Sequence, residues 1–194
     1  MKLVVNMTGT TPLVMHNPRL VDPLYEITKA IKELTSQKPR TDEIDAQIAE
    51  LEFKGGLYIN EQGPYVEAQA IRKTWIMGAR LSKKGKAVER GVTMLDIEYP
   101  LIFTGPRDAE ELWKNKDFVW RAQTVIPGGK GRVMRTRPQF AQWALDVAMD
   151  LDLEMLNRRD FERVISDSGL YIGLLEARSI GRGKFTTKIQ NGTA

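Results

Sequence analysis

Cationic residues beside glycines are the part of this sequence best suited to chemistry. Three arginines, Arg132, Arg135 and Arg137, follow a glycine-rich stretch that contains Lys130. Arginine donates charge-assisted hydrogen bonds to phosphate oxygens, and glycine lets the backbone come close to a ligand. We therefore expect these four cations to hold phosphate groups. Met134 lies among them.

A second loop later in the sequence has the same chemistry. Arg182 lies between two glycines, Arg178 precedes them and Lys184 follows them. No acidic residue interrupts residues 178–184. Successive backbone N–H groups in such a loop can grip a phosphate together with the arginines. The alternative interpretation is a pair of flexible turns without a ligand, because glycine is common in turns.

A third group of cations lies on an expected helix and in the loop after it. Arg72, Lys73 and Arg80 belong to the helix, and Lys83 belongs to the loop. We expect all four to line the same channel as the two glycine-rich loops. For the loop lysine the alternative is a structural role, because cations near the C-terminus of a helix complement its dipole.

The distribution of charge along the chain supports one basic surface. Segments 72–90, 121–138 and 178–188 hold 16 of the 29 basic residues and one of the 25 acidic residues. The three segments therefore carry a net charge of +15, and the remaining residues carry −11. Such a split favours a polyanionic partner. The alternative is three unrelated solvated loops.

Composition excludes several kinds of site. The 194 residues include no cysteine, which rules out disulfides and thiolate zinc sites, and one histidine, His16. A lone histidine disfavours acid–base relays and histidine metal sites. We expect His16 to be a satisfied structural residue, and we expect no catalytic residue, no metal and no cofactor.

The hydropathy pattern gives no sign of a membrane segment. The sequence has no run of about 18 apolar residues, the length that a transmembrane helix needs. Its first residues turn polar too early for a secretory signal peptide. We therefore expect a cytoplasmic protein without a membrane partner.

The periodicity of apolar residues predicts an α+β protein, with residues 1–194 forming a single domain. Strands are expected at residues 2–8, 57–59, 64–66, 92–103, 140–149 and 183–189. Helices are expected at residues 23–36, 42–54, 68–82 and 158–172. Asp22 is expected to cap the first helix, because its carboxylate can accept hydrogen bonds from the first free N–H groups.

Two insertions interrupt a simpler order of elements. A helical pair and hairpin occupy about 15–66, and a long thumb-like β-hairpin excursion occupies about 104–139. Without them the order is strand, helix, strand, strand, helix, strand, which is the ferredoxin-like plan. In that plan both helices cover one face of a four-stranded antiparallel sheet. The last strand carries Phe185 as its only aromatic residue, which is expected to point inward, so binding should depend on backbone contacts rather than base stacking.

This order and several short motifs resemble the RAMP superfamily, the RRM-like proteins that form the repeating backbone of CRISPR effector complexes. Residues 11–17, Thr-Pro-Leu-Val-Met-His-Asn, are similar to the segment after the family's first strand. Residues 65–75 resemble the family's passage from a strand through small residues into a helix with basic residues. Residues 173–185 are similar to its glycine-rich loop, and residues 104–139 lie where backbone subunits carry a thumb. We hypothesise that Met134 is the apolar tip of this thumb and wedges between bases; the alternative is a buried anchor.

The resemblance implies a protein that binds single-stranded RNA or DNA without sequence preference. It also implies a homo-oligomer, with copies arranged head to tail along the strand, and other effector-complex subunits as further partners. The chain is short for a complete backbone subunit, so a stand-alone relative encoded by a phage or another mobile element fits the resemblance equally well.

Two other functions compete with this interpretation. Some RAMP subunits cut RNA with an aspartate after the first strand, and Asp22 lies in a comparable region, so a metal-dependent ribonuclease is the first. The second is a mimic of a CRISPR subunit that binds protein partners. It predicts that alanine at Arg132, Arg135 and Arg137 leaves function intact.

Overall fold

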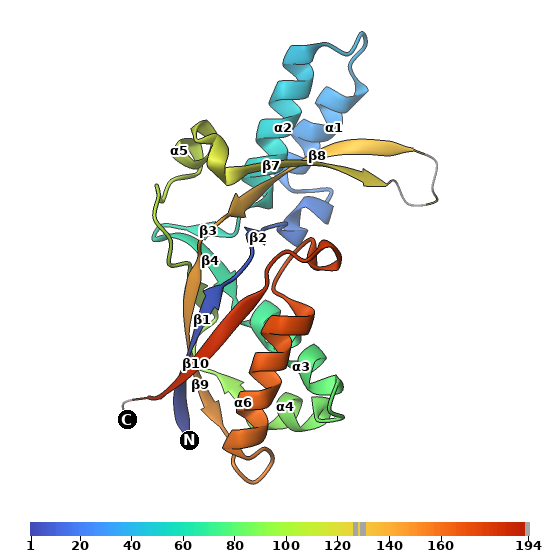
Figure 1. Cartoon of the computed structure of the whole chain (residues 1–194). Helices are drawn as coiled ribbons and strands as arrows, with labels where there is room; N and C mark the ends of the chain where they lie inside the picture. The colour runs from blue at the N-terminus through green and yellow to red at the C-terminus, as the bar shows by residue number, and fades with distance from the viewer. Residues whose placement is uncertain (126–127, 129–130, 193–194) are drawn as a thin grey trace.

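The computed structural model describes residues 1–125, 128 and 131–192, and it confirms the predicted α+β class (Figure 1). Its central sheet has the strand order β10-β1-β9-β5, and all neighbouring strands are antiparallel. The strands are β1 (Lys2–Gly9), β5 (Val92–Met94), β9 (Ala144–Leu151) and β10 (Phe185–Asn191). This is the order of the predicted ferredoxin-like plan.

Two helices cover one face of this sheet, as predicted (Figure 1). They are α3 (Ala68–Arg80) and α6 (Arg158–Asp167). In β1 every second residue is buried beneath them, because side chains alternate between the two faces of a strand. Trp75 of α3 and Phe161 of α6 meet edge to face, with ring centroids 5.6 Å apart. The core therefore lies between the sheet and this helical layer.

A short helix, α4 (Gly85–Gly91), follows α3 and packs on it. Arg72 donates a hydrogen bond to the backbone carbonyl of Glu89, near the C-terminal end of α4. Arg80 packs against Gly85 at the opposite end. Both arginines therefore fasten α4 to α3.

The first insertion contains the predicted helical pair and hairpin. Its elements are η1 (Pro18–Val21), α1 (Glu26–Ser36), α2 (Asp42–Gly56), β3 (Ile59–Asn60) and β4 (Gly63–Glu67). Thr41 caps α2 by accepting the N–H of Ile44. The expected cap of α1 is wrong, because that helix begins at Glu26 and Asp22 instead accepts the N–H of Leu24 in the preceding turn.

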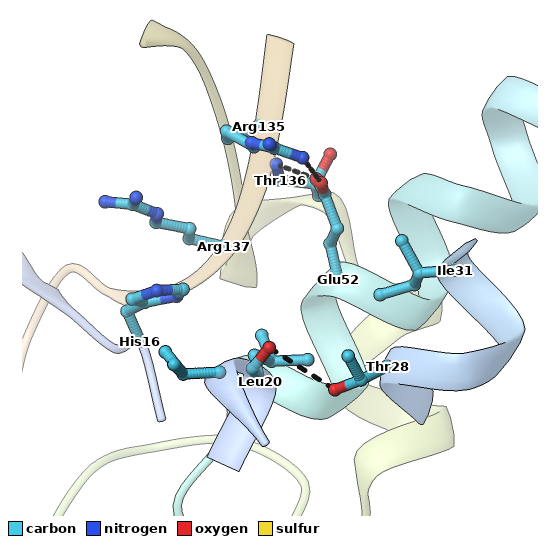
Figure 2. A pocket seen from close by; sticks show the side chains of 9 residues that line it. His16, Leu20, Thr28, Ile31, Glu52, Arg135, Thr136 and Arg137 are labelled. Carbon is cyan, nitrogen blue, oxygen red and sulfur yellow. Dashed lines mark hydrogen bonds and ion pairs between the residues drawn. The ribbon is translucent and has the colours of Figure 1, made fainter. Parts of the chain in front are cut away.

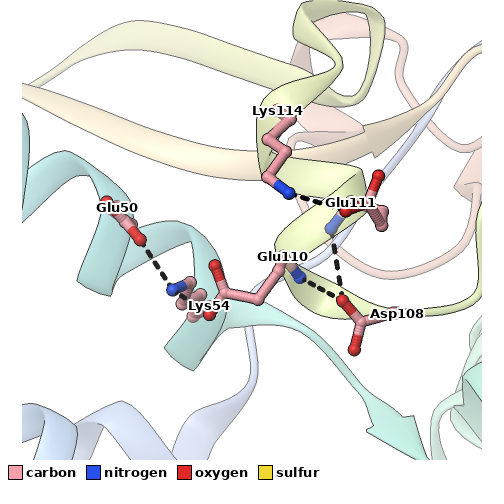
Figure 3. Close-up of polar contacts among 6 residues, drawn as sticks. All are labelled: Glu50, Lys54, Asp108, Glu110, Glu111 and Lys114. Atoms are coloured by element: carbon pink, nitrogen blue, oxygen red, sulfur yellow. Dashed lines mark hydrogen bonds and ion pairs between the residues drawn. The ribbon is translucent and has the colours of Figure 1, made fainter.

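The second insertion ends in the predicted long hairpin. It contains α5 (Ala109–Lys114), η2 (Lys116–Phe118), β7 (Val119–Val125) and β8 (Arg132–Phe140). At its inner end β8 also pairs with β2 (Leu13–Val14). Figure 3 shows how α5 is joined to α2: Lys54 of α2 forms ion pairs with Glu50 and Glu110, and Asp108 caps α5.

Two predicted strands have different bounds in the structure. Residues 92–103 form two strands, because the chain bends at residues 95–97: β5 pairs with β9, whereas β6 (Glu98–Pro100) pairs with β4. Residues 140–149 span the end of β8, a turn and most of β9. Phe140 belongs to β8, and the buried Trp143 lies in the turn, where its indole N–H donates to the carbonyl of Thr11.

The last predicted helix also ends earlier than expected. Regular α6 stops at Asp167 and continues as one π-helical turn, η3 (Ser168–Ile172). A π turn inserts an extra residue, which rotates the following side chains out of register. Leu170, which lies in this turn, is therefore exposed. Leu81 is exposed as well, because α3 ends before it at Arg80.

Both ends of the described chain lie at the end of the central sheet away from the hairpin (Figure 1). Leu3 pairs with Asn191, and Gly192 donates its N–H to the carbonyl of Lys2 over 3.1 Å. Within the described residues, no helix combines the length and apolar character needed to cross a membrane.

Candidate nucleic-acid interface

The open face of the central sheet carries no aromatic side chain. Its side chains come from alternate positions of the four strands: Lys2, Val4, Asn6, Thr8, Thr93, Ala144, Asp146, Ala148, Asp150, Thr186, Lys188 and Gln190. Phe185 points into the core as predicted and is 3% exposed. Asn6 donates a hydrogen bond to Asp146 over 2.6 Å, which places a carboxylate near the middle of this face. Base stacking on the sheet is therefore not available.

A second surface, above the sheet, consists of four hollows that share lining residues. Residues that identify them are Arg121 and Met134 in the hairpin hollow, His16 and Ile31 in the histidine hollow, Tyr58 and Lys73 in the helix hollow, and Met77 and Ser179 in the loop hollow. The hairpin hollow meets the histidine hollow at Glu52, Arg135 and Thr136. The histidine hollow meets the helix hollow at His16 and Val21. The helix hollow meets the loop hollow at Leu175, Glu176 and Arg178. We call this series the groove.

The histidine hollow lies between β8 and the helical pair and has a volume of about 300 Å³ (Figure 2). His16 and Arg137 occupy one side of it, and Glu52 and Ile31 occupy the other. Glu52 is buried, accepts the N–H of Thr136 over 2.9 Å and forms an ion pair with Arg135. The hollow therefore combines an apolar wall with fixed charged groups.

The helix hollow and the loop hollow bring α3 against the glycine-rich loop. Lys73 of α3 and Arg178 of the loop line the helix hollow together. The guanidinium of Arg178 also donates to the sulfur of Met77 over 3.4 Å. Burial lowers the pKa of Lys184, and the positive charge of Arg178 lowers it further. Lys184 therefore lies within electrostatic reach of Arg178.

Side chains of β8 alternate between the two faces of the hairpin, so Arg132 lies on one face and Arg135 and Arg137 lie on the other. Arg135 and Arg137 share a face of the hairpin with Trp120, since Trp120 is opposite Arg137 in the register. Arg182 of the glycine-rich loop lies over the Trp120 ring, with its guanidinium carbon 5.7 Å from the centroid. Arg137 also forms an ion pair with Glu176 of that loop over 3.1 Å. These contacts fasten the loop to the base of the hairpin.

Met134 is not the apolar tip that we expected. It lies opposite Gln123 within the paired part of the hairpin, on the face that lines the hairpin hollow with Arg121. Arg132 pairs with Val125 at the outer end of the described ladder, and its guanidinium donates to Gln123 over 3.4 Å. Lys130 lies outside the described residues.

Among the predicted site residues, six line none of the four hollows: Arg72, Arg80, Lys83, Arg132, Arg182 and Lys184. Arg72 and Arg80 contact α4, and Lys83 lies in the turn that follows α3, whereas the helix hollow is lined by the side of α3 that carries Lys73. One residue advances a helix by about 100°, so adjacent side chains such as Arg72 and Lys73 point in different directions. The expectation that Arg72, Lys73, Arg80 and Lys83 all line one channel is therefore wrong.

Acidic residues from elsewhere in the sequence enter the groove and reduce its charge. Glu52 pairs with Arg135 and Glu176 with Arg137, and Asp45 pairs with Arg40 over 2.5 Å. None of these three acids belongs to the segments with surplus positive charge. The groove is therefore less basic than the distribution of charge along the chain predicts.

Sequence reasoning assigned His16 a structural role, but it lies where two hollows meet. Its pKa is lowered mainly by burial and also by the charge of Arg137. The ring is thus neutral at pH 7 and turned toward the groove beside an arginine (Figure 2). The only sequence feature that could have indicated this position is that His16 belongs to the segment 11–17, which resembles a family motif. Asn17 anchors this segment, because its side chain accepts the N–H of Arg19 and donates to the carbonyl of Leu57.

Comparison with known proteins relates the chain to a solved structure. No protein family and no curated protein matches the sequence. The chain resembles a CRISPR effector chain in fold. That chain belongs to the cryo-EM structure of the Type III-B Cmr-beta bound to cognate target RNA, with a TM-score of 0.51 and 14% sequence identity. The match covers 97% of this chain and 59% of that chain. The predicted similarity to CRISPR effector subunits is thus supported at the level of fold.

Among the residues that the structure describes, no group of three or more histidine, aspartate or glutamate side chains is arranged to hold a metal ion. Asp22, the aspartate suggested by the nuclease alternative, is exposed and hydrogen-bonds to the backbone of Leu24.

Proposed function

We propose that this protein binds the backbone of single-stranded nucleic acid along the groove, without strong base preference and without cutting the strand. The observation that carries the proposal is the convergence of all three basic segments. Lys73 represents the first segment, Arg135 and Arg137 the second, and Arg178 the third. They line hollows that share lining residues, which would let one phosphodiester chain contact all of them.

The chemistry of the groove favours phosphates over bases. Guanidinium groups donate paired, charge-assisted hydrogen bonds to phosphate oxygens. The open sheet face, where an RRM-type protein stacks bases, is aromatic-free and carries Asp146. Contacts should therefore follow the backbone of the strand and depend steeply on salt.

RNA is the favoured strand in this proposal. The protein whose fold this chain resembles is bound to target RNA. We extend that partner to this chain as a hypothesis and keep single-stranded DNA as the competing ligand. We further propose that several copies bind along one strand, alone or with other effector subunits, as in an effector complex. Sedimentation with RNA of increasing length tests this assembly, which predicts stepwise growth of the complex.

The test is a comparison of two double variants. Arg137→Ala with Arg178→Ala removes two groove cations, whereas Arg159→Ala with Arg163→Ala removes two cations from α6, which lines none of the four hollows. A hydrogen bond to a charged group contributes about 1.5 kcal/mol, so the groove variant should bind labelled single-stranded RNA roughly 100-fold more weakly. Fluorescence anisotropy measures this loss, and the α6 variant should bind like the wild type.

Two outcomes would overturn the proposal. Equal binding by both double variants would exclude the groove as the interface. Cleavage of the RNA when magnesium is added, seen on a denaturing gel, would replace a binding function by the ribonuclease alternative. A parallel titration with single-stranded DNA of the same sequence shows whether RNA or DNA is the preferred ligand.

A further inference from the structure

One aromatic residue differs from all the others in its exposure. All 15 phenylalanine, tyrosine and tryptophan residues lie in the described part of the chain, and Tyr171 alone is exposed, at 61%. The others are buried or half-buried in the core, the hairpin base or the helical insertion. Aromatic rings are usually placed to bury area, so the exposure of Tyr171 calls for another explanation.

Tyr171 lines the loop hollow at one end of the groove. Arg178 lines the same hollow, and Met77 and Ile172 form apolar wall beside it. Among the described residues, Tyr171 forms no pair with another aromatic ring and no side-chain hydrogen bond. Its ring is therefore open to a ligand that reaches Arg178.

Close packing fixes the turn that presents this ring. Tyr171 belongs to the π turn η3, whose first residues, Ser168 and Gly169, are buried. A Cβ atom at Gly169 would lie 2.0 Å from the carbonyl oxygen of Phe185, and one at Gly78 would lie 2.0 Å from the Ser168 hydroxyl. The turn is thus clamped between α3 and β10, and single π turns often occur at functional sites.

We propose that Tyr171 is a stacking platform for one base of the bound strand, with the adjacent phosphate held by Arg178. This inference rests on the proposed function and adds a base contact to it. Stacking on a fixed ring loses little side-chain freedom, and it accepts any base because every base has a π face. The platform would therefore add affinity at the end of the groove without adding sequence preference.

The test combines affinity with a spectroscopic signal from the base. Short single-stranded RNAs carrying one 2-aminopurine at successive positions are titrated with the full chain. The wild type should quench the fluorophore at one position of the bound register. Tyr171→Ala should abolish that quenching and weaken binding about tenfold. The slope of log affinity against log salt should stay unchanged, because the substitution removes no charge.

Two matched variants complete the experiment. Tyr171→Phe keeps the ring and should retain both quenching and affinity. Leu170→Ala removes a neighbouring side chain of similar exposure, 62%, and should have no effect. If Tyr171→Ala binds and quenches like the wild type, the stacking proposal is wrong while the proposed function stands. If the wild type itself fails to bind RNA or DNA, both are overturned.

Discussion

At the scale of single residues, half of the groove cations already have carboxylate partners. Arg135 and Arg137 are held by Glu52 and Glu176, which fixes their guanidinium groups before any ligand arrives. Each ion pair weakens the attraction of the arginine for a phosphate, but it fixes the position of the guanidinium group. His16 lies between these groups without a charge of its own at neutral pH, so it can add one when the pH falls.

The affinity for single strands should rise as the pH falls through the lowered pKa of His16. Burial and Arg137 hold this pKa below its usual value in the free protein, while Glu176 and Glu52 oppose the shift and Arg135 adds to it. A bound phosphate stabilises the protonated ring and so raises this pKa, which means that binding takes up a proton and strengthens as the pH falls toward the lowered pKa of the free protein.

Anisotropy titrations between about pH 5 and pH 8 measure this effect. His16→Gln keeps a polar side chain but cannot be charged, and its affinity should vary much less with pH. An identical pH profile in the wild type and the His16→Gln variant would show that the pH dependence comes from groups other than His16.

At the scale of elements, the loop between α6 and β10 is shaped by unusual backbone conformations. Leu175 and Ala177 both adopt the left-handed region, with φ of 58° and 59°, on either side of Glu176. Each costs roughly 1 kcal/mol in a residue with a Cβ atom. The surrounding contacts outweigh this cost, and the result is that Glu176 reaches Arg137.

Two glycines of this loop allow a matched test of its packing. Gly181 and Gly183 both have positive φ, 82° and 69°. A Cβ atom at Gly181 would meet nothing within 4 Å, whereas one at Gly183 would lie 2.1 Å from the carbonyl oxygen of Leu174. Gly181→Ala should lower the free energy of unfolding by about 1 kcal/mol, and Gly183→Ala by clearly more.

Urea denaturation measures both changes. The Gly183 variant should also bind RNA more weakly, because displacement of the loop moves Arg178. Equal destabilisation by the two substitutions would mean that the loop is not held as closely as the structure shows.

At the scale of the whole molecule, the salt dependence of binding reports how many cations act. The groove is lined by six basic residues and three acidic residues. Each acid pairs with one of the cations, which leaves Lys73, Arg121 and Arg178 without a carboxylate partner among the described residues.

On single strands each neutralised phosphate contributes roughly −0.7 to the slope of log affinity against log salt. If only the three unpaired cations neutralise phosphates, the slope should be about −2. If all six groove cations do so, it should be about −4. Glu176→Gln should free Arg137 and steepen the slope by about 0.7. Titrations over a range of potassium chloride concentrations give both slopes. A wild-type slope near −4 would show that the ion pairs open on binding.

The order of the core elements could be predicted from the sequence because strand and helix periodicities are local properties. Leu3, Val5 and Met7 alternate along β1 as a half-buried strand requires. Failures arose where a local pattern ran across a boundary: the alternation that predicts one strand over 140–149 continues through the turn at Trp143. The π turn after Asp167 likewise left no mark in the apolar pattern.

The candidate site could be predicted only in part, because charges that are close in sequence need not share a face. Lys73 reaches the groove while its neighbour Arg72 fastens α4. Glu52 pairs with Arg135 across 83 positions of sequence, a contact that no local pattern reveals. Convergence of the three segments depends on tertiary packing, and the fold shows it to be partial.

The position of the chain ends has a practical consequence. The beginning of β1 and the end of β10 lie side by side at the end of the sheet farthest from the hairpin (Figure 1). A fluorophore, an affinity tag or a surface tether attached at either end would point away from the groove. The protein can thus be immobilised for sensor measurements with its cationic surface directed toward the solution, and a short linker joining the two ends would leave that surface unobstructed.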